Sequence, residues 1–257
     1  MEWLEELHTQ IRKRRDPWVV LEGRHAVEAA VAGWWDVHGV VASAESSWDL
    51  PGWSGLEVQR RSRQELEALA GYAFHRGVLG LARQPEETGD VAGLLEELSK
   101  EALIVVCPGL ADAANAGAIL RNAAALGAEA VLFGSDGVSP FERKAVRASG
   151  GALFRIPVRV ADGGQMLRCL KAGGFRLVGT AAGKGNPAIH EVDWPAGRLA
   201  LVFGAEDQGL GPFWSAACNR MVGIPMESGM DSLNVAASSA VCLWEIARQR
   251  SEQAPPL

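Results

Sequence analysis

Hydrophobic residues in the second half of this chain gather in short unbroken runs, and helical stretches fall between most of them. Six of these runs predict strands: 103–107, 130–133, 153–158, 175–179, 199–203 and 221–224. Strands that are continuously apolar and alternate with helices indicate a parallel sheet covered on both faces. Ligands of such sheets bind at the carboxyl ends of the strands. We therefore predict an α/β fold and expect the chemistry in the loops that follow the strands.

The first half has shorter elements of mixed pattern. Strand-like runs cover 18–21, 37–42, 56–58 and 78–82, and helical spacing covers 2–15, 23–31 and 63–70. The polar stretch 84–90 contains proline and glycine, as linkers do, and a helix is predicted from Val91 to about Lys100. We divide the chain into four parts: an N-terminal helical arm (1–17), a small α/β domain (18–84), a linker with its lead-in helix (85–100) and a larger α/β domain (101–257).

Composition narrows the functional classes. No apolar run approaches the roughly 20 residues that span a bilayer, and the first residues lack a secretory pattern, so we expect a cytoplasmic protein without a membrane partner. The four cysteines show no Cys-x-x-Cys spacing and the five histidines do not cluster, which argues against disulfides and zinc. The formal net charge of −6 lies in residues 1–100, which hold 11 Lys+Arg against 17 Asp+Glu. A nucleic-acid partner would therefore need the local basic patches at 12–15, 60–63 and 143–147.

The loop after the run 103–107 leads into a mostly apolar helix that carries Asn115 and Arg121. Asn115 is placed to cap this helix, and Arg121 lies four residues after Gly117, on the same face, where the missing side chain leaves room for a guanidinium. A guanidinium suits phosphate or carboxylate. The alternative is a solvent-facing arginine that only stabilises its helix.

The loop after the run 199–203 contains Gly204, Glu206, Gly209 and Gly211. Its glycines let backbone amides approach a ligand, and Glu206 brings a carboxylate to the strand end. The spacing differs from the Gly-x-Gly-x-x-Gly of dinucleotide-binding loops.

A third loop joins the last apolar run to the C-terminal helix. Gly229 permits a turn, Asp231 or Ser232 can cap the helix, and Ser232 and Asn234 bracket Leu233. The small residues 236–240 let another backbone approach closely. On this stretch alone, a capped and tightly packed helix without chemistry is an equal alternative.

Together, the three loops resemble the motifs of the SpoU/TrmH family of RNA 2′-O-ribose methyltransferases in the SPOUT superfamily. The matching stretches are Asn115-x-Gly117-x-x-x-Arg121, Gly204-Ala205-Glu206 through Gly209-Leu210, and Ile224-Pro225-Met226 with Ser232-Leu233-Asn234-Val235. Segment 144–151 resembles the family's basic segment. Segments 23–27 and 75–78 resemble the small RNA-binding domain of members that act on large-subunit ribosomal RNA, so the closest likeness is to the ribosomal RNA guanosine-2′-O-methyltransferase type. One departure is Ala113, where the family often has proline.

The resemblance implies a parallel-sheet SPOUT domain with a C-terminal trefoil knot, preceded by a small α/β RNA-binding domain, in a homodimer. It implies S-adenosylmethionine as methyl donor, without a metal. The implied cofactor-pocket residues are Gly204, Ile224, Met226 and Leu233.

The implied reaction is methyl transfer to a ribose 2′-hydroxyl of structured RNA, with 23S ribosomal RNA favoured. Arg121 would act by electrostatic stabilisation, with a role as base left open, and Asn115, Glu206, Ser232 and Asn234 would orient it and the ribose. The implied RNA contacts are Arg24, His25, Arg76, Lys144 and Arg147.

Three alternatives remain at this point. The substrate could be transfer RNA, or the protein could be a catalytically idle RNA-binding or ribosome-assembly protein on the same scaffold. A nucleotide-dependent oxidoreductase is disfavoured, because it would need the missing glycine fingerprint.

Overall fold

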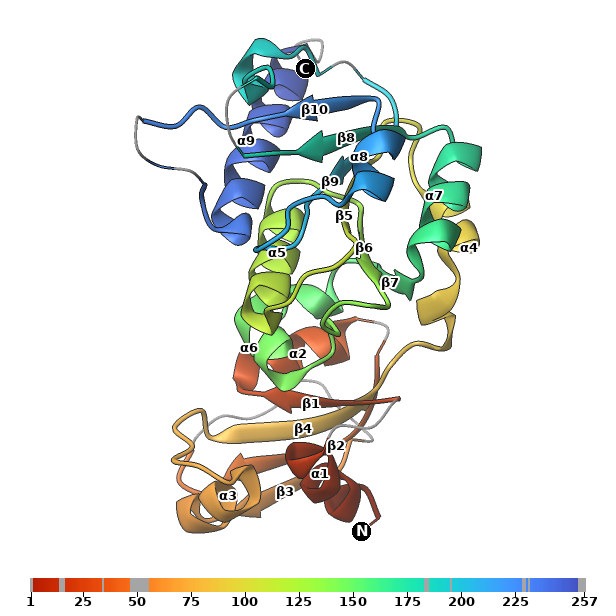
Figure 1. Ribbon diagram of the computed structural model, residues 1–257. Coiled ribbons are helices and arrows are strands. Elements are labelled where there is room, and N and C mark those ends of the chain that lie inside the picture. Colours follow the sequence, from red (N-terminus) through yellow and green to blue (C-terminus); the bar gives the residue numbers. More distant parts are fainter. Residues whose placement is uncertain are drawn as a thin grey trace.

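The computed structural model describes residues 2–13, 17–33, 35–46, 56–182, 185–194, 196–227, 230 and 232–253. Figure 1 shows two sheets, a smaller one near the N-terminus and a larger one formed by the rest of the chain.

The larger sheet has six parallel strands in the order β10-β8-β9-β5-β6-β7. Its strands are β5 (Leu103–Cys107), β6 (Ala130–Gly134), β7 (Val158–Ala161), β8 (Arg176–Thr180), β9 (Leu199–Val202) and β10 (Arg220–Val222). The helices are α4 (Val91–Glu97), α5 (Ala113–Ala125), α6 (Arg143–Ser149), α7 (Gly163–Ala172), α8 (Pro212–Ala217) and α9 (Val235–Gln253), with a short η3 (Ile189–Glu191). The predicted α/β fold with a parallel sheet is confirmed.

Successive residues of a strand point to opposite faces, so one strand supplies two cores. On β5, Val105 and Cys107 join the core under α5 and α9, whereas Ile104 and Val106 join the core under α4 and α7. Burial on both faces explains why the strands are continuously apolar.

The predicted strand 153–158 is wrong over most of its length. Residues Ala152–Phe154 form the 3₁₀ helix η2, and β7 begins only at Val158. Gly150 and Gly151 both have positive φ, 59° and 93°, which turns the chain away from an extended path. The run is apolar because Leu153 and Phe154 are buried at the junction with the smaller sheet, not because it pairs with a strand.

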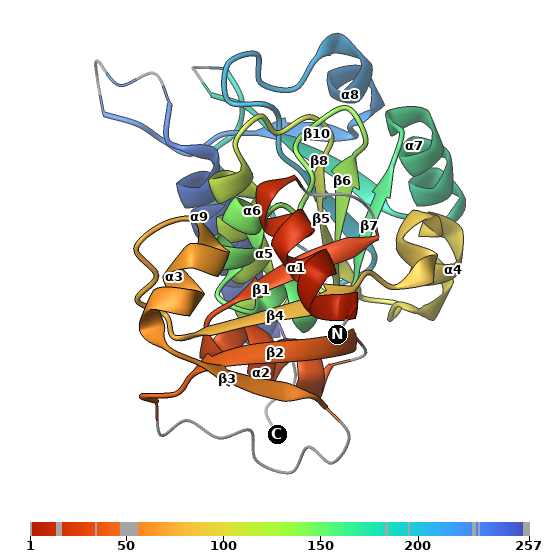
Figure 2. The ribbon, with the colours of Figure 1, turned by 90° about the horizontal axis from the view of Figure 1, so that it is seen from below.

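The smaller sheet has the order β1-β4-β2-β3, in which β4 is antiparallel to β1 and β2 while β2 and β3 are parallel. Its elements are α1 (Glu2–Arg12), β1 (Trp18–Glu22), α2 (Arg24–Ala32), β2 (Asp36–Ser43), β3 (Val58–Arg61), α3 (Arg63–Ala70) and β4 (Val78–Arg83), followed by η1 (Glu86–Gly89). Helices α1 and α3 share a core on one face, and α2 covers the other face, toward the larger sheet (Figure 2).

The two sheets share one continuous apolar core at their junction. The ring of Trp35 packs edge-on against Phe154 at 4.9 Å and against Phe141 at 6.0 Å between centroids. This junction fixes the position of α6 relative to the smaller sheet. No helix within the described ranges is long and apolar enough to cross a membrane.

Candidate active site

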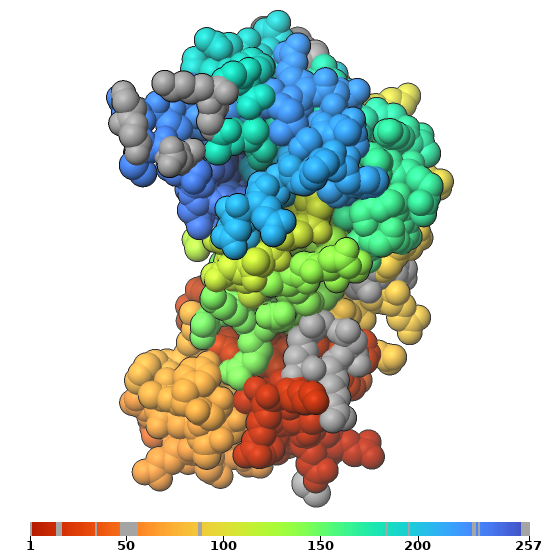
Figure 3. All heavy atoms as spheres, viewed as in Figure 1, coloured from red at the N-terminus to blue at the C-terminus, as the bar shows by residue number. Residues whose placement is uncertain are grey.

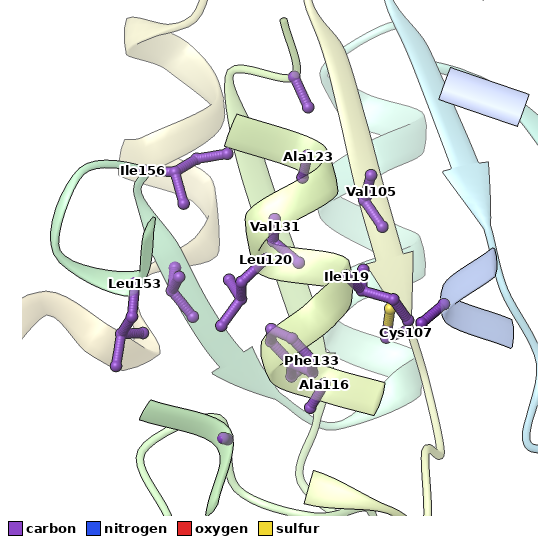
Figure 4. Close-up of a cluster of buried hydrophobic side chains, with 14 of the residues drawn as sticks. Val105, Cys107, Ala116, Ile119, Leu120, Ala123, Val131, Phe133, Leu153 and Ile156 are labelled. Carbon is purple, nitrogen blue, oxygen red and sulfur yellow. The ribbon is translucent and has the colours of Figure 1, made fainter. Parts of the chain in front are cut away.

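Helix α5 carries the polar residues of the first loop on a rigid support. Figure 4 shows its apolar face, with Ala116, Ile119, Leu120 and Ala123, packed on the strands of the larger sheet. The cap of α5 is Asp112, whose Oδ1 accepts from the N–H groups of Ala114 and Asn115. The prediction that Asn115 caps the helix is therefore wrong. Because Asp112 takes that task, the Asn115 side chain is left to bond elsewhere.

A chain of hydrogen bonds joins the three predicted loops. The Asn115 Nδ2 donates to Glu206 Oε1 at 2.6 Å, and the Asn234 Nδ2 donates to Asn115 Oδ1 at 3.0 Å. The Oδ1 of Asn234 accepts from the N–H groups of Ala236 and Ala237, which caps α9. The cap is thus Asn234 and not Ser232, while Asp231 lies outside the described residues. One asparagine therefore both begins α9 and binds the first loop.

The Glu206 carboxylate is held in its ionised form. Partial burial alone would raise its pKa, but hydrogen bonds from the Asn115 side chain and from the Ala111 N–H outweigh burial, so the pKa lies below its ordinary value. Near neutral pH the second loop therefore presents a fixed negative charge.

A cavity of about 520 Å³ opens beside this network. Its walls include all four residues predicted for the cofactor, Gly204, Ile224, Met226 and Leu233, as well as Glu206, Ser232 and Asn234. Of the other lining residues, Ala205, Asp207, Gly209 and Val235 stand within the quoted motifs. Sequence reasoning missed Thr180, Ala181, Ala182, Phe203, Val222, Ser238 and Cys242. The segment 180–182 follows the end of β8, so the strand-end rule could have found it.

The walls of this cavity suit a ligand with an apolar ring and polar ends. Leu233 is 42% exposed, which leaves an apolar side chain for a ligand to cover. Burial raises the pKa of Cys242 to about 12, so this thiol forms a neutral wall. S-adenosylmethionine fits this donor set, since a carboxylate, amides and apolar side chains converge on one space.

Gly204 is required by the fold of its own loop. A Cβ at this position would lie 2.1 Å from the Gly209 carbonyl carbon and 2.3 Å from the Leu210 nitrogen. Two backbone hydrogen bonds between Ala205 and Gly209, of 3.1 and 2.9 Å, close the turn. A side chain on Gly204 would therefore displace one wall of the cavity.

Arg121 lies further along α5 and stands apart from the hydrogen-bonded chain. Its side chain is exposed, and no residue within the described ranges pairs with it. A Cβ at Gly150 would lie 3.9 Å from the Arg121 Cδ, so the arginine extends past the end of α6. Gly117 was predicted to leave room for the Arg121 guanidinium, but it faces α6 instead. A Cβ at Gly117 would lie 2.2 Å from the Ala145 carbonyl oxygen of α6. The glycine allows the two helices to meet rather than making room for the guanidinium.

Four of the five predicted RNA contacts line a second cavity, of about 330 Å³, between the two sheets. They are Arg24, His25, Arg76 and Arg147. The fifth, Lys144, forms an ion pair with Asp112 at 2.8 Å. Within the described ranges, no three His, Cys, Asp or Glu side chains gather as a metal site would require.

Comparison with known proteins settles the family. A sequence model of the SpoU rRNA Methylase family matches residues 102–244. The chain belongs to this family. Among its SpoU relatives, the 23S rRNA (guanosine-2′-O-)-methyltransferase RlmB of Acinetobacter baylyi is 36% identical over 76% of this chain and 80% of the relative. RlmB of Escherichia coli K12 is 33% identical over 77% of this chain and 81% of the relative.

Solved structures of SpoU proteins have the same fold over both sheets. The SpoU methyltransferase AviRb from Streptomyces viridochromogenes, solved with the cofactor AdoMet, has a TM-score of 0.84 at 24% identity and covers 96% of this chain and 98% of its own. An RNA 2′-O ribose methyltransferase has a TM-score of 0.79 at 31% identity and covers 96% of both chains. The likeness therefore includes the N-terminal part and not only the family region.

Proposed function

We propose that this protein transfers a methyl group from S-adenosylmethionine to the 2′-hydroxyl of a guanosine ribose in 23S ribosomal RNA. The observation that carries the proposal is the convergence of three loops on one cavity, joined through Glu206, Asn115 and Asn234. Membership of the SpoU family and the names of its RlmB relatives support the reaction and the RNA.

The first cavity would hold the cofactor. Gly204, Ile224, Met226 and Leu233 would form its wall, chiefly through backbone groups and apolar contacts. When bound, S-adenosylmethionine supplies an electrophilic methyl group. Glu206 would lie close to the positively charged sulfonium group and would favour its binding electrostatically.

Arg121 would act on the ribose. A ribose hydroxyl is a weak nucleophile, so the reaction needs correct positioning and stabilisation of the charge that develops as the proton leaves. A guanidinium keeps its proton at physiological pH, which favours hydrogen bonding to the developing alkoxide or a neighbouring phosphate over a role as base. The hydrogen-bonded chain of Asn115 and Asn234, with Ser232 nearby, would then position the ribose.

Family resemblance also supports three finer proposals. Residues 18–84 form the RNA-binding domain, the C-terminal segment threads through an earlier loop to make a trefoil knot, and two copies form a homodimer. An apolar stripe on α9 supports the dimer, because Val241 and Trp244 are 40% and 56% exposed although both are apolar. A ribosomal RNA substrate would place the protein in the cytoplasm.

Two measurements test the proposal. Calorimetry should detect binding of S-adenosylmethionine, and labelled methyl should pass from it to unmodified 23S transcript but not to transfer RNA. Binding without transfer to any RNA would favour the idle scaffold, and transfer to transfer RNA alone would favour the other substrate class.

A further inference from the structure

The second cavity lies where the smaller sheet meets the end of α6, at the waist that Figure 3 shows between the red and orange atoms and the green ones. One wall is the end of β1 with the first turn of α2, and another is the start of β4. The third wall comes from α6 and the two glycines after it. The lining residues are Glu22, Gly23, Arg24, His25, Ala26, Ser46, Arg76, Val78, Val146, Arg147, Gly150 and Gly151.

Three guanidinium groups converge on this cavity, Arg24 from α2, Arg147 from α6 and Arg76 from the loop before β4. Arg76 has no pairing partner within the described residues. Arg24 is held only loosely, 3.7 Å from Glu28, and Arg147 lies 3.9 Å from Glu22. Such weak pairs leave the positive charge available, so an anionic ligand would be favoured.

The first turn of α2 adds to this positive field. Its cap residue, Gly23, has φ of 90° and no side chain to accept a hydrogen bond. The N–H groups of Arg24, His25 and Ala26 find no acceptor within the described ranges. Phosphate oxygens are the usual partners of such free N–H groups.

Among the described residues that line the cavity, Glu22 carries the only carboxylate, and its charge is already paired. The Glu22 side chain is 1% exposed and accepts from Arg143 Nε at 2.7 Å and from the Tyr72 hydroxyl at 2.8 Å. Arg143 also donates to the carbonyl oxygen of Ile11 at 3.0 Å. This Glu22–Arg143–Tyr72 clasp joins α6 to the smaller sheet, which keeps the walls of the cavity together without repelling an anion.

The cavity is connected to the site of chemistry through Gly150. This glycine lines the cavity, and a Cβ on it would lie 3.9 Å from the Arg121 Nη1. A volume of about 330 Å³ is at the lower end of the range for ligand pockets, roughly 300–1,000 Å³, so it admits one nucleotide and not a duplex.

We infer that the cavity binds a single unstacked nucleotide of the RNA substrate, adjacent to the methylated ribose, with its phosphate between Arg76, Arg24 and the first turn of α2. The inference rests on the proposed function, because it places the nucleotide relative to Arg121. The smaller sheet then contributes directly to positioning the target, in addition to general RNA affinity.

Arg76→Ala tests this site, and Arg63→Ala is the matched control. Arg63 carries the same charge at the start of α3, which packs on the same small sheet, but it pairs with Glu67 at 3.1 Å, contacts His75 at 3.0 Å and does not line the cavity. Binding of unmodified 23S transcript is measured across about 50–200 mM salt, where each lost phosphate contact lowers the slope of log K against log salt by about 0.7–0.9. We expect Arg76→Ala to lower the slope by this amount and to raise KM more than it lowers kcat, with Arg76→Lys restoring both.

An unchanged slope and KM in Arg76→Ala, or an equal loss in Arg63→Ala, would overturn the site. Calorimetry with S-adenosylmethionine checks that every variant keeps its cofactor cavity. Failure of the proposed function gives a different result from failure of the site. If the wild-type protein transfers no methyl group, its RNA binding can still show a salt slope that depends on Arg76.

Discussion

The two cavities are similar in size and opposite in chemistry. The first, of about 520 Å³, is lined by glycines, apolar side chains, hydroxyl and amide groups and the carboxylates of Glu206 and Asp207, and by no lysine or arginine among the described residues. The second, of about 330 Å³, is lined by three arginines and a histidine. The first would favour a cationic cofactor because it holds carboxylates, and the second would favour a nucleotide phosphate because it holds guanidinium groups. Arg121 lines neither cavity but extends past Gly150, which lines the second. The proposed function places the chemistry where the two ligands would meet.

Breaking the Glu22–Arg143–Tyr72 clasp at the second cavity gives the largest expected effect, a loss of stability. Arg143→Met removes the partner of the buried Glu22 carboxylate and should lower the free energy of unfolding by about 3–5 kcal/mol. Urea unfolding measures the loss. Arg63→Ala removes an exposed ion pair with Glu67 and an exposed hydrogen bond with His75, and should change stability by less than about 0.5 kcal/mol. Equal stability of the two variants would show that the clasp does not hold the second cavity together.

Arg121→Ala tests the proposed role of the Arg121 guanidinium in methyl transfer. Loss of its guanidinium should slow methyl transfer by about 100- to 1,000-fold, as for other groups that stabilise developing charge. The affinity for S-adenosylmethionine should not change, because Arg121 does not line the first cavity. Single-turnover rates and calorimetry check the two statements, and an unchanged rate would remove Arg121 from the mechanism.

Gly204→Ala affects the first cavity alone. The added Cβ would overlap Gly209 and Leu210, which should cost about 1–3 kcal/mol and weaken S-adenosylmethionine binding about 5- to 150-fold. Gly211→Ala is the control, since no atom of the described residues beyond its chain neighbours would lie within 4 Å of the added Cβ. The salt dependence of RNA binding should stay the same in both. A changed salt slope would mean that the two cavities are not independent.

Two substitutions at Asn234 give the smallest expected effect. Together they separate its capping of α9 from its hydrogen bond to Asn115. Asn234→Ala removes the cap of α9 and should lower stability by about 1 kcal/mol. Asn234→Asp keeps the capping oxygen but cannot donate to Asn115, so stability should be retained while methyl transfer slows. Thermal unfolding and kcat are measured on the pair. Full activity of Asn234→Asp would show that the donation to Asn115 is dispensable.

The two cavities also differ in how far the sequence predicts them. Residues of the first, such as Ile224 and Leu233, stand in contiguous loops after continuously apolar strands, so the parallel-sheet rule places them at one edge. The second cavity combines Arg24, Arg76 and Arg147, which are distant in sequence and meet only because the sheets pack through η2 and α2.

Local capping was the least predictable feature. Asp112 and Asn115 are both good caps, as are Ser232 and Asn234, and propensity does not choose between them. Tertiary contacts decide: Asn115 reaches Glu206, and Asn234 lies where it can bond both α9 and Asn115. The strand predicted over 153–158 is wrong for a similar reason. Burial at the junction between the sheets gives the same apolar pattern as burial in a strand.

The most direct test of the account is to map 2′-O-methylated riboses in 23S ribosomal RNA after incubation with S-adenosylmethionine and either the wild-type protein or Arg121→Ala. The account predicts a 2′-O-methylguanosine that appears with the wild type and is absent or strongly reduced with the variant. Methylation of a base, or an equal level of ribose methylation by both proteins, would contradict it.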